Sequence, residues 1–281
     1  MNPVGAKPLI ALTGATGFIG QCLLRDLPKR GYRLRVLLRR PSVVPMECAS
    51  AVVGDLARPQ NMTAALSDVD AVIHSAALGS GMSGVPEDDY RTLNTEATMA
   101  LARAAQRAGV KRFVFLSSIR AQSGPSADHV LTEDLIPRPT DAYGRSKLAA
   151  EQGLAELDID WVALRLVLVY GEGVKGNMAE LVRLARMPYP LPVGALRNRR
   201  SLLSLDNLVA AMRRGLGRRP GLVPVPAAML RTALQAAGRG EVYDRLSGSL
   251  VAEPARLREL GWSPPGHNIG RTRGASLDEA P

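Results

Sequence analysis

The chain has 281 residues, enough for one large α/β domain with an elaborated C-terminal part or for two small domains. Its cysteines, Cys22 and Cys48, have no paired spacing, and its histidines, His74, His129 and His267, are scattered, so we expect neither a disulfide framework nor a metal site. The net charge of +10 is spread over the whole chain without a basic run interleaved with aromatics, which argues against nucleic-acid binding.

Short apolar runs alternate with helical patterns over about the first 170 residues. Strands are predicted at 8–13, 32–39, 51–55, 70–75, 112–117 and 160–169. Helices are predicted at 17–28, 61–66, 94–108 and 141–157. This alternation implies right-handed crossovers and a doubly wound parallel sheet, which is a Rossmann-like α/β fold.

The pattern loosens after residue 170. A helix is predicted at 178–186, followed by a proline-rich irregular stretch at 188–201 and then by short helices and turns. We therefore expect a dinucleotide-binding domain at 1–170, a small substrate-binding lobe at 171–265 and a frayed tail at 266–281.

Three glycines, Gly14, Gly17 and Gly20, follow the first predicted strand and open the first predicted helix. This is the context that a dinucleotide fingerprint requires. Glycine permits the tight turn and the close approach of a pyrophosphate, which then faces the helix N-terminus. The alternative is an ordinary glycine-rich connection.

The end of the second predicted strand bears on the choice of cofactor. NAD-binding proteins usually place an acid there, on the ribose 2′-hydroxyl, whereas this chain has Arg39 and Arg40. A cation suits a 2′-phosphate, so the sequence favours NADP over NAD, unless both arginines are only solvated. Asp55 is expected to reach the adenine edge, and the small Ala76 and Ala77 leave room for the cofactor backbone.

Tyr143 and Lys147 are four residues apart, which is about one turn of a helix. A free tyrosine has a pKa of about 10 and is a poor base at neutral pH. A fixed cation nearby favours the phenolate, so the pair is suited to proton transfer. The alternative is a solvated helix face.

Several motifs together resemble the extended short-chain dehydrogenase/reductase family, in its NAD-dependent epimerase/dehydratase branch with UDP-glucose 4-epimerase-like members. The motifs are TGATGFIG, GDL, HSAA, FVFLSSIRA, YGRSK, RLVLVYG and ELGW, in the family's order over about residues 8–265. The resemblance implies that Tyr143 is the acid/base, that Lys147 lowers its pKa, and that Ser118 hydrogen-bonds the reacting oxygen.

The resemblance also implies cofactor and substrate contacts. Asn94 is similar to a helix asparagine that supports the site, and Asn177 and Arg200 match positions that contact the nucleotide-sugar. The expected cofactor contacts are Gly14, Thr16, Gly17, Phe18, Ile19, Gly20, Arg39, Asp55, Leu56, Ala76, Ala77, Asn94, Tyr143 and Lys147. An arginine suits a diphosphate because its fork bonds two oxygens at once, although Arg200 is also readily explained as a surface residue.

The chain departs from the family pattern at two places. Leu166 follows Arg165 where the family often has proline. About 25 to 30 residues, a strand and a helix in relatives, are missing near residues 208–223. The loss leaves Tyr143 untouched, but it puts substrate binding by the C-terminal lobe in question.

We therefore expect an NAD(P)-dependent epimerase or oxidoreductase that transfers hydride at a ring carbon of a UDP-sugar. Alternatives are an NADP-dependent reductase of a small carbonyl substrate, a non-catalytic dinucleotide-sensing module of the same fold, and an RNA binder whose affinity falls steeply with salt. No apolar run approaches the roughly 20 residues of a membrane span, and the N-terminus has no secretory layout, so we expect a cytoplasmic protein without membrane partners. The sequence leaves a homodimer open.

Overall fold

The computed structural model describes residues 7–79 and 84–169, and in the C-terminal part residues 183, 186, 188, 199, 201, 225–238, 243 and 247–259. The chain divides into two compact units. The first contains Met1–Gly124 and Ile136–Val169, and the second contains Pro125–Leu135 and Tyr170–Pro281.

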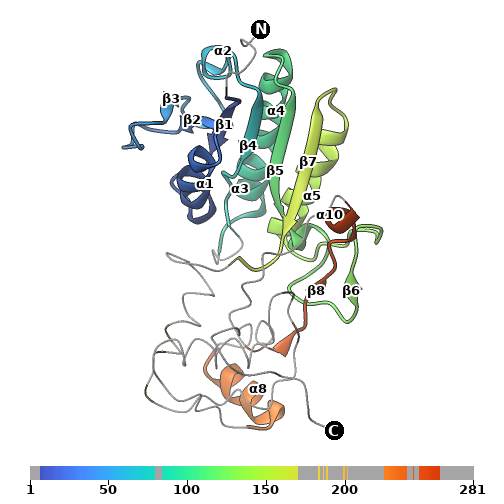
Figure 1. Ribbon diagram of the computed structural model, residues 1–281. Coiled ribbons are helices and arrows are strands. Elements are labelled where there is room, and N and C mark those ends of the chain that lie inside the picture. Colours follow the sequence, from blue (N-terminus) through green and yellow to red (C-terminus); the bar gives the residue numbers. More distant parts are fainter. Residues whose placement is uncertain are drawn as a thin grey trace, which may run out of the picture. The chain divides into compact units, whose positions relative to one another are not determined.

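The first unit is built on a six-stranded sheet in which every strand runs parallel to its neighbours (Figure 1). The strands are β1 Leu9–Thr13, β2 Arg33–Leu38, β3 Ala49–Val52, β4 Ala71–His74, β5 Arg112–Ser118 and β7 Asp160–Leu166. Their spatial order is β3-β2-β1-β4-β5-β7. The predicted parallel, Rossmann-like sheet is therefore confirmed.

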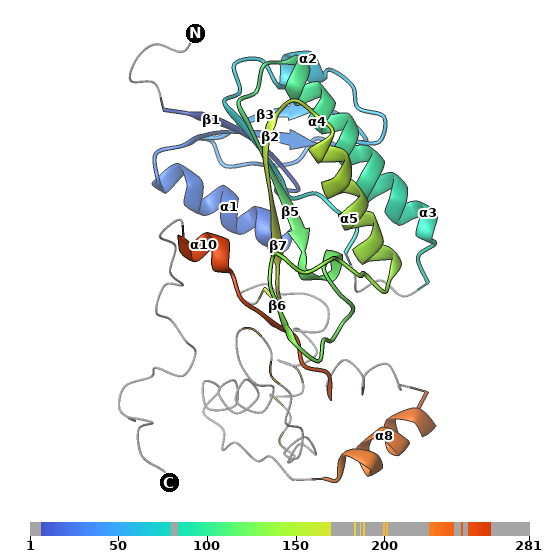
Figure 2. The same cartoon turned by 90° about the vertical axis from the view of Figure 1, so that its right-hand side faces the viewer.

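Helices cover both faces of this sheet. Helix α1, Phe18–Lys29, lies on one face, and α4, Ala97–Arg107, and α5, Ala142–Ala155, lie on the other (Figure 2). On the α1 face, leucines of the helix pack against aliphatic side chains of β1 and β2: Leu23, Leu24, Leu27, Ile10, Leu12, Leu34 and Val36. On the opposite face, α4 and α5 enclose two phenylalanines of β5: Leu101, Ala105, Ala150, Leu154, Phe113 and Phe115. This aliphatic core holds the carboxyl ends of the strands in place.

Three predicted boundaries were wrong, and one of them is the end of β7, which lies at Leu166 rather than at Val169. Strand β3 ends at Val52 rather than at Asp55, because Gly54 takes a left-handed φ of +71° that a strand cannot continue. The helix expected from Asn94 begins earlier, as α3, Glu87–Tyr90, which continues through a π-helical turn, Arg91–Glu96, into α4. Acidic residues in the first turn of α3 explain the early start, because they favour the positive end of a helix dipole.

The strand order reverses between β1 and β4, which marks one place on the carboxyl edge of the sheet. From β1 the chain builds outward through β2 and β3, and then returns to place β4 on the other side of β1. Ligands of such sheets bind where the strand order reverses, outside the carboxyl ends of the strands. The glycine turn after β1, the segment after His74 and the end of β5 at Ser118 all lie on this edge.

In the second unit, the described residues form a small parallel ladder of β6, Val130–Leu131, with β8, Val251–Ala252. Two helices accompany it, α8, Ala227–Ala236, and α10, Ala255–Glu259 (Figure 1). Within the described ranges no helix is both long and apolar enough to cross a bilayer. The predicted gap near 208–223 and the predicted tail from 266 lie outside the described residues.

Candidate active site

The turn after β1 has room for backbone but not for side chains. Gly14 has a φ of +69°, and a Cβ on it would lie 2.5 Å from the amide nitrogen of Ala76. A Cβ on Gly20 would overlap the carbonyl oxygen of Gly14 and lie 2.7 Å from the Cα of Ala15. The Gly17 N–H donates to the Gly14 carbonyl over 2.9 Å, which closes the turn. Gly14 and Gly20 therefore let the turn after β1 approach the segment after β4 on one side and α1 on the other at backbone distance.

The N-terminus of α1 suits an anion. Its cap residue, Gly17, offers no side-chain hydrogen bond, and its first turn contains no acidic residue. The first N–H groups of a helix have no partner within the helix, and they carry the positive end of its dipole. Thr16 and Gly17 are exposed there, and Phe18 and Ile19 are half-buried, so backbone donors and a glycine cradle fit a dinucleotide pyrophosphate.

Neighbouring strand ends carry the remaining expected cofactor contacts. Arg39 is exposed just past β2, and Asp55 is exposed just past β3, where its carboxylate accepts the Ala57 N–H over 3.0 Å. Half-buried Leu56 follows, and after β4 Ala76 is half-buried and Ala77 exposed. The structure thus brings these residues to the same sheet edge as the glycine turn.

A buried histidine connects the glycine turn to α4. His74 Nδ1 lies 2.7 Å from Thr13 Oγ1, and His74 Nε2 lies 2.9 Å from Thr98 Oγ1. Because the Thr98 hydroxyl donates to the Asn94 carbonyl, Nε2 carries the ring hydrogen and Nδ1 accepts from Thr13. Burial lowers the pKa of His74 to about 3, and the charge of Lys147 acts in the same direction, so the ring is neutral. Sequence reasoning missed this role of His74.

Asn94 is buried where three segments meet. Its amide accepts from the Leu78 N–H over 2.7 Å, and it donates to the Leu78 carbonyl and to the Ser146 hydroxyl, each over 3.1 Å. Ser146 in turn donates to the Tyr143 carbonyl over 2.8 Å. Asn94 therefore ties the segment after β4 to the helix that carries Tyr143, and Ser146 is a second residue that sequence reasoning missed.

Ser118, Tyr143 and Lys147 come together at the carboxyl end of β5. The Ser118 hydroxyl is hydrogen-bonded to the Tyr143 phenol. Burial raises the pKa of Tyr143 above its ordinary value, and the bond to Ser118 and the charge of Arg120 oppose that shift. Asp141 accepts from the Gly144 N–H over 2.6 Å, and this cap fixes the start of α5, the helix that carries Tyr143.

The Lys147 ammonium is fully enclosed in the structure. It donates to the Leu116 carbonyl over 2.9 Å and lies 4.5 Å from the centre of the Phe115 ring. Burial lowers the pKa of Lys147 to about 8, and the nearby Glu151 carboxylate acts against that shift. The side chains that lower the Tyr143 pKa here are Ser118 and Arg120, whereas the resemblance assigned that effect to Lys147.

Comparisons with known proteins bear on this arrangement. Residues 10–221 match the NAD dependent epimerase/dehydratase family. The UDP-glucose 4-epimerase of Vibrio cholerae is 32% identical over an alignment of 298 positions that covers 91% of this chain and 90% of that protein. The chain belongs to the NAD dependent epimerase/dehydratase family.

Other proteins are similar to this chain over different lengths. The ceramide reductase of Caulobacter vibrioides is 30% identical over 74% of this chain and 60% of that protein. The structure of MoeE5 in complex with UDP-glucuronic acid and NAD is similar over 92% of this chain and 95% of that chain, with a TM-score of 0.64 and 27% identity. The 298-position alignment to the Vibrio protein is longer than this 281-residue chain, so that relative has residues that this chain lacks.

A largely buried cluster of polar side chains lies next to Lys147, around Glu151 of α5. Ser117 donates to Glu151 Oε1 over 2.5 Å, and the Arg165 guanidinium donates to both oxygens of Glu151, the shortest bond being 2.6 Å. Arg165 also donates to the Gln122 side-chain oxygen. Glu151 lies one turn beyond Lys147 on α5, and this second four-residue spacing is the signal that could have revealed it. The cluster links α5 to the ends of β5 and β7.

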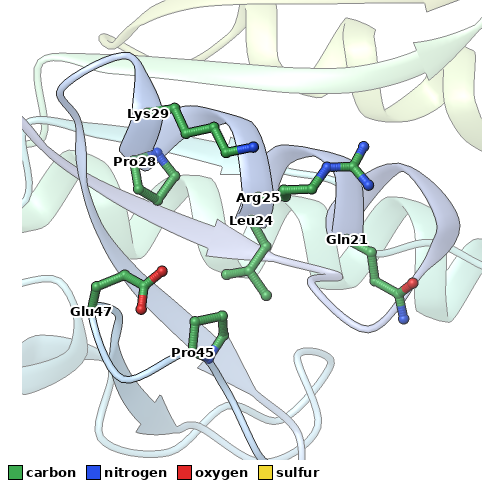
Figure 3. Close-up of a pocket in the computed structure, with 7 residues that line it drawn as sticks. All are labelled: Gln21, Leu24, Arg25, Pro28, Lys29, Pro45 and Glu47. Carbon is green, nitrogen blue, oxygen red and sulfur yellow. The ribbon is translucent and has the colours of Figure 1, made fainter.

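Two expected substrate contacts, Asn177 and Arg200, lie outside the described residues. Among the described residues, no group of three or more histidine, cysteine or acidic side chains is placed to hold a metal ion. A hollow of about 310 Å³ between α1 and the segment that follows β2 is lined by Gln21, Leu24, Arg25, Pro28, Lys29, Pro45 and Glu47 (Figure 3). It contains none of the expected site residues and is separate from the candidate active site.

Proposed function

We propose that this chain is an NAD-dependent epimerase that acts on a UDP-sugar. The observation that carries the proposal is the similarity to a UDP-glucose 4-epimerase over nearly the whole of both chains. The site geometry supports it, because a glycine cradle and a hydrogen-bonded serine–tyrosine pair lie on one edge of the sheet. MoeE5, whose structure is similar to this chain, was solved with NAD and either UDP-glucuronic acid or UDP-glucose. These complexes are consistent with a UDP-sugar substrate for this chain.

The residues at the carboxyl edge, near the point where the strand order reverses, would hold the dinucleotide. The Gly14 to Gly20 turn and the α1 N-terminus would receive the pyrophosphate, and Asp55, Ala76 and Ala77 would lie beside the adenosine half. The bound nicotinamide supplies a hydride acceptor and donor next to the sugar ring. NADP binding stays a prediction, because Arg39 is exposed just past β2, where a cation suits a 2′-phosphate. Dissociation constants measured for NAD and NADP test it.

Proton transfer would be carried by Tyr143 and Ser118. The Ser118 oxygen accepts the Arg120 N–H over 3.2 Å, so its own hydrogen is available to the Tyr143 oxygen or to a substrate oxygen. As a phenolate, Tyr143 takes the proton of the sugar hydroxyl: the substrate O–H bond breaks and the phenol O–H bond forms. In an epimerase the same proton returns to the same oxygen after the sugar presents its other face.

The proposal is tested with a panel of UDP-, GDP- and dTDP-sugars, each with NAD or NADP, followed by NMR of the products. We expect conversion of a UDP-sugar to its epimer without net consumption of cofactor. Mass spectrometry of the purified protein adds an independent criterion, because an epimerase needs a resident NAD. An empty dinucleotide site together with stoichiometric cofactor consumption would contradict the epimerase assignment.

A second candidate is a reductase of a carbonyl substrate. The similarity to a ceramide reductase and to a 2-alkyl-3-oxoalkanoate reductase favours it, although this chain covers 60% and 63% of those proteins. Stoichiometric oxidation of NADH or NADPH by a carbonyl compound, with every UDP-sugar inert, would favour this candidate.

The homodimer and the cytoplasmic location expected from the sequence stay predictions.

A further inference from the structure

Arg120 lies between the two segments that carry the proton-transfer pair. It follows Ser118 by two residues, on a short helical turn, Ile119–Ala121, directly after β5. Its backbone N–H donates to the Ser118 hydroxyl over 3.2 Å. Its carbonyl group packs against α5, where a Cβ on Gly144 would overlap the carbonyl oxygen and lie 3.0 Å from its carbon. The backbone of Arg120 is therefore fixed by both Ser118 and the start of the Tyr143 helix.

The guanidinium of Arg120 is fixed as well. It forms an ion pair with Asp141, whose other carboxylate oxygen caps α5 through the Gly144 N–H. The side chains of Arg120 and Asp141 are only 23% and 32% exposed, so water screens this pair less than a surface pair. The cation is thus held by the same cap that sets the position of Tyr143.

Among the described residues, few charged or titratable groups lie near the Tyr143 phenol. From the turn after β5 it faces Ser118 and Arg120, and from α3 it faces the edge of the Tyr90 ring, with ring centres 6.1 Å apart. On its own helix, the Lys147 ammonium is engaged by the Leu116 carbonyl. Among these groups, Ser118 and Arg120 lower the pKa of Tyr143, whereas burial, the largest effect, and Tyr90 raise it.

We propose that Arg120 is a positioning residue for the proposed proton transfer, in which its Asp141-anchored guanidinium stabilises the phenolate of Tyr143. The catalytic consequence rests on the proposed function, because it requires Tyr143 to accept a proton from substrate. Before transfer the negative charge is on the phenolate; proton transfer passes it to the substrate oxygen, and it leaves that oxygen with the hydride that the ring carbon gives up. A fixed positive charge at the phenolate increases the fraction of Tyr143 that is ready to accept the proton at a given pH.

The direct test is an NMR titration that needs no substrate. The protein is labelled with ¹³C at the ζ carbon of its six tyrosines, and Tyr143→Phe identifies the Tyr143 signal. We expect Arg120→Gln to move the Tyr143 titration to higher pH, and Arg120→Lys to stay closer to the wild type. The matched control is Arg145→Gln, which removes another arginine ion pair of the same region, with Glu87, at the outer side of α5. It should leave the titration unchanged.

Circular dichroism at each pH shows over which pH range each variant is folded. Within that range, the pH dependence of the reaction rate is a second measurement of the effect of Arg120 on Tyr143. There, the rate of Arg120→Gln should fall by the same factor as its fraction of Tyr143 phenolate, and Arg120→Lys should lose less. A merely structural role predicts an unmoved Tyr143 titration together with equal loss of rate for Arg120→Lys and Arg120→Gln. Either that pattern, or titrations of Tyr143 that are the same in wild type and Arg120→Gln, overturns the proposal.

Failure of the proposed function has a different signature. If no UDP-sugar is converted but the Tyr143 titration responds to Arg120 and not to Arg145, the electrostatic role of Arg120 stands and the epimerase assignment fails. If UDP-sugars are converted in a Tyr143-dependent manner while neither the titration nor the rate profile responds to Arg120, only the role of Arg120 fails.

Discussion

Replacing Gly20 by alanine should abolish dinucleotide binding while leaving the chain folded. The added Cβ would overlap the Gly14 carbonyl oxygen and lie 2.6 Å from the Gly14 carbonyl carbon. These neighbours are backbone atoms, so the turn itself must move. Overpacking of this kind costs about 1–3 kcal/mol, and the better helix propensity of alanine offsets up to about 1 kcal/mol of it. The net loss is smaller than the roughly 5–15 kcal/mol by which domains are stable, so the sheet should persist.

The assay is thermal unfolding with and without NAD. A ligand at about 100 times its dissociation constant stabilises the folded state by about 2.7 kcal/mol, which is a measurable rise in Tm. We expect the wild type to show this rise and Gly20→Ala to lose it. The matched control is Gly31→Ala, which places a side chain at a φ of +87° with no atom within 4 Å. It should lower the Tm, because left-handed strain costs about 1–2 kcal/mol, and yet keep the response to NAD. An undiminished NAD response in Gly20→Ala would refute the reasoning that places the dinucleotide on this turn.

Three further predictions concern charge. Because burial lowers the pKa of Lys147 to about 8, activity that needs its positive charge should fall as the pH rises through about 8. Glu151 acts against that shift, so Glu151→Gln should move the falling limb of the pH–rate profile to lower pH. An unmoved limb would contradict the interaction of Glu151 with Lys147. Arg39→Asp should shift the ratio of dissociation constants from NADP toward NAD, and a constant ratio would mean that Arg39 is only solvated. The folded-state pKa of His74, about 3, is below its ordinary value of 6.5, so protonation favours the unfolded chain. Stability should therefore fall by up to about 1.4 kcal/mol per pH unit as the pH drops below 6.5, and denaturant titrations should show a shallower fall in His74→Asn.

The features that local patterns determine were predictable from the sequence. The apolar runs became β1, β4 and β5 because the central strands of a parallel sheet are covered on both faces and are therefore mainly apolar. The glycine spacing predicted the turn because Gly14 adopts a conformation that other residues rarely take. The four-residue spacing of Tyr143 and Lys147 placed both on α5 because helical periodicity depends only on neighbours in the chain.

The polar contacts that complete the site could not be predicted in this way. Thr13 and His74 are 61 positions apart, and Ser117 and Glu151 are 34 apart, so each pair meets only because the sheet brings their strands and helices together. Arg120 carried no signal of its own, because a single arginine after a serine pair is consistent with any exposed loop. Partners of buried polar groups are set by packing, and local periodicity contains no information about them.

The most direct test of the account follows the interconversion of UDP-glucose and UDP-galactose by NMR, with NAD, in wild type and Tyr143→Phe. The matched control is Tyr32→Phe, which changes a tyrosine that is 39% exposed and outside the site. Loss of acid–base catalysis should lower turnover by a factor of about 10² to 10⁴ in Tyr143→Phe and leave Tyr32→Phe at the wild-type rate, with NAD binding intact in both. Equal rates in all three proteins would contradict the role of Tyr143, and the absence of any conversion by the NAD-loaded wild type would contradict an epimerase that acts on these sugars.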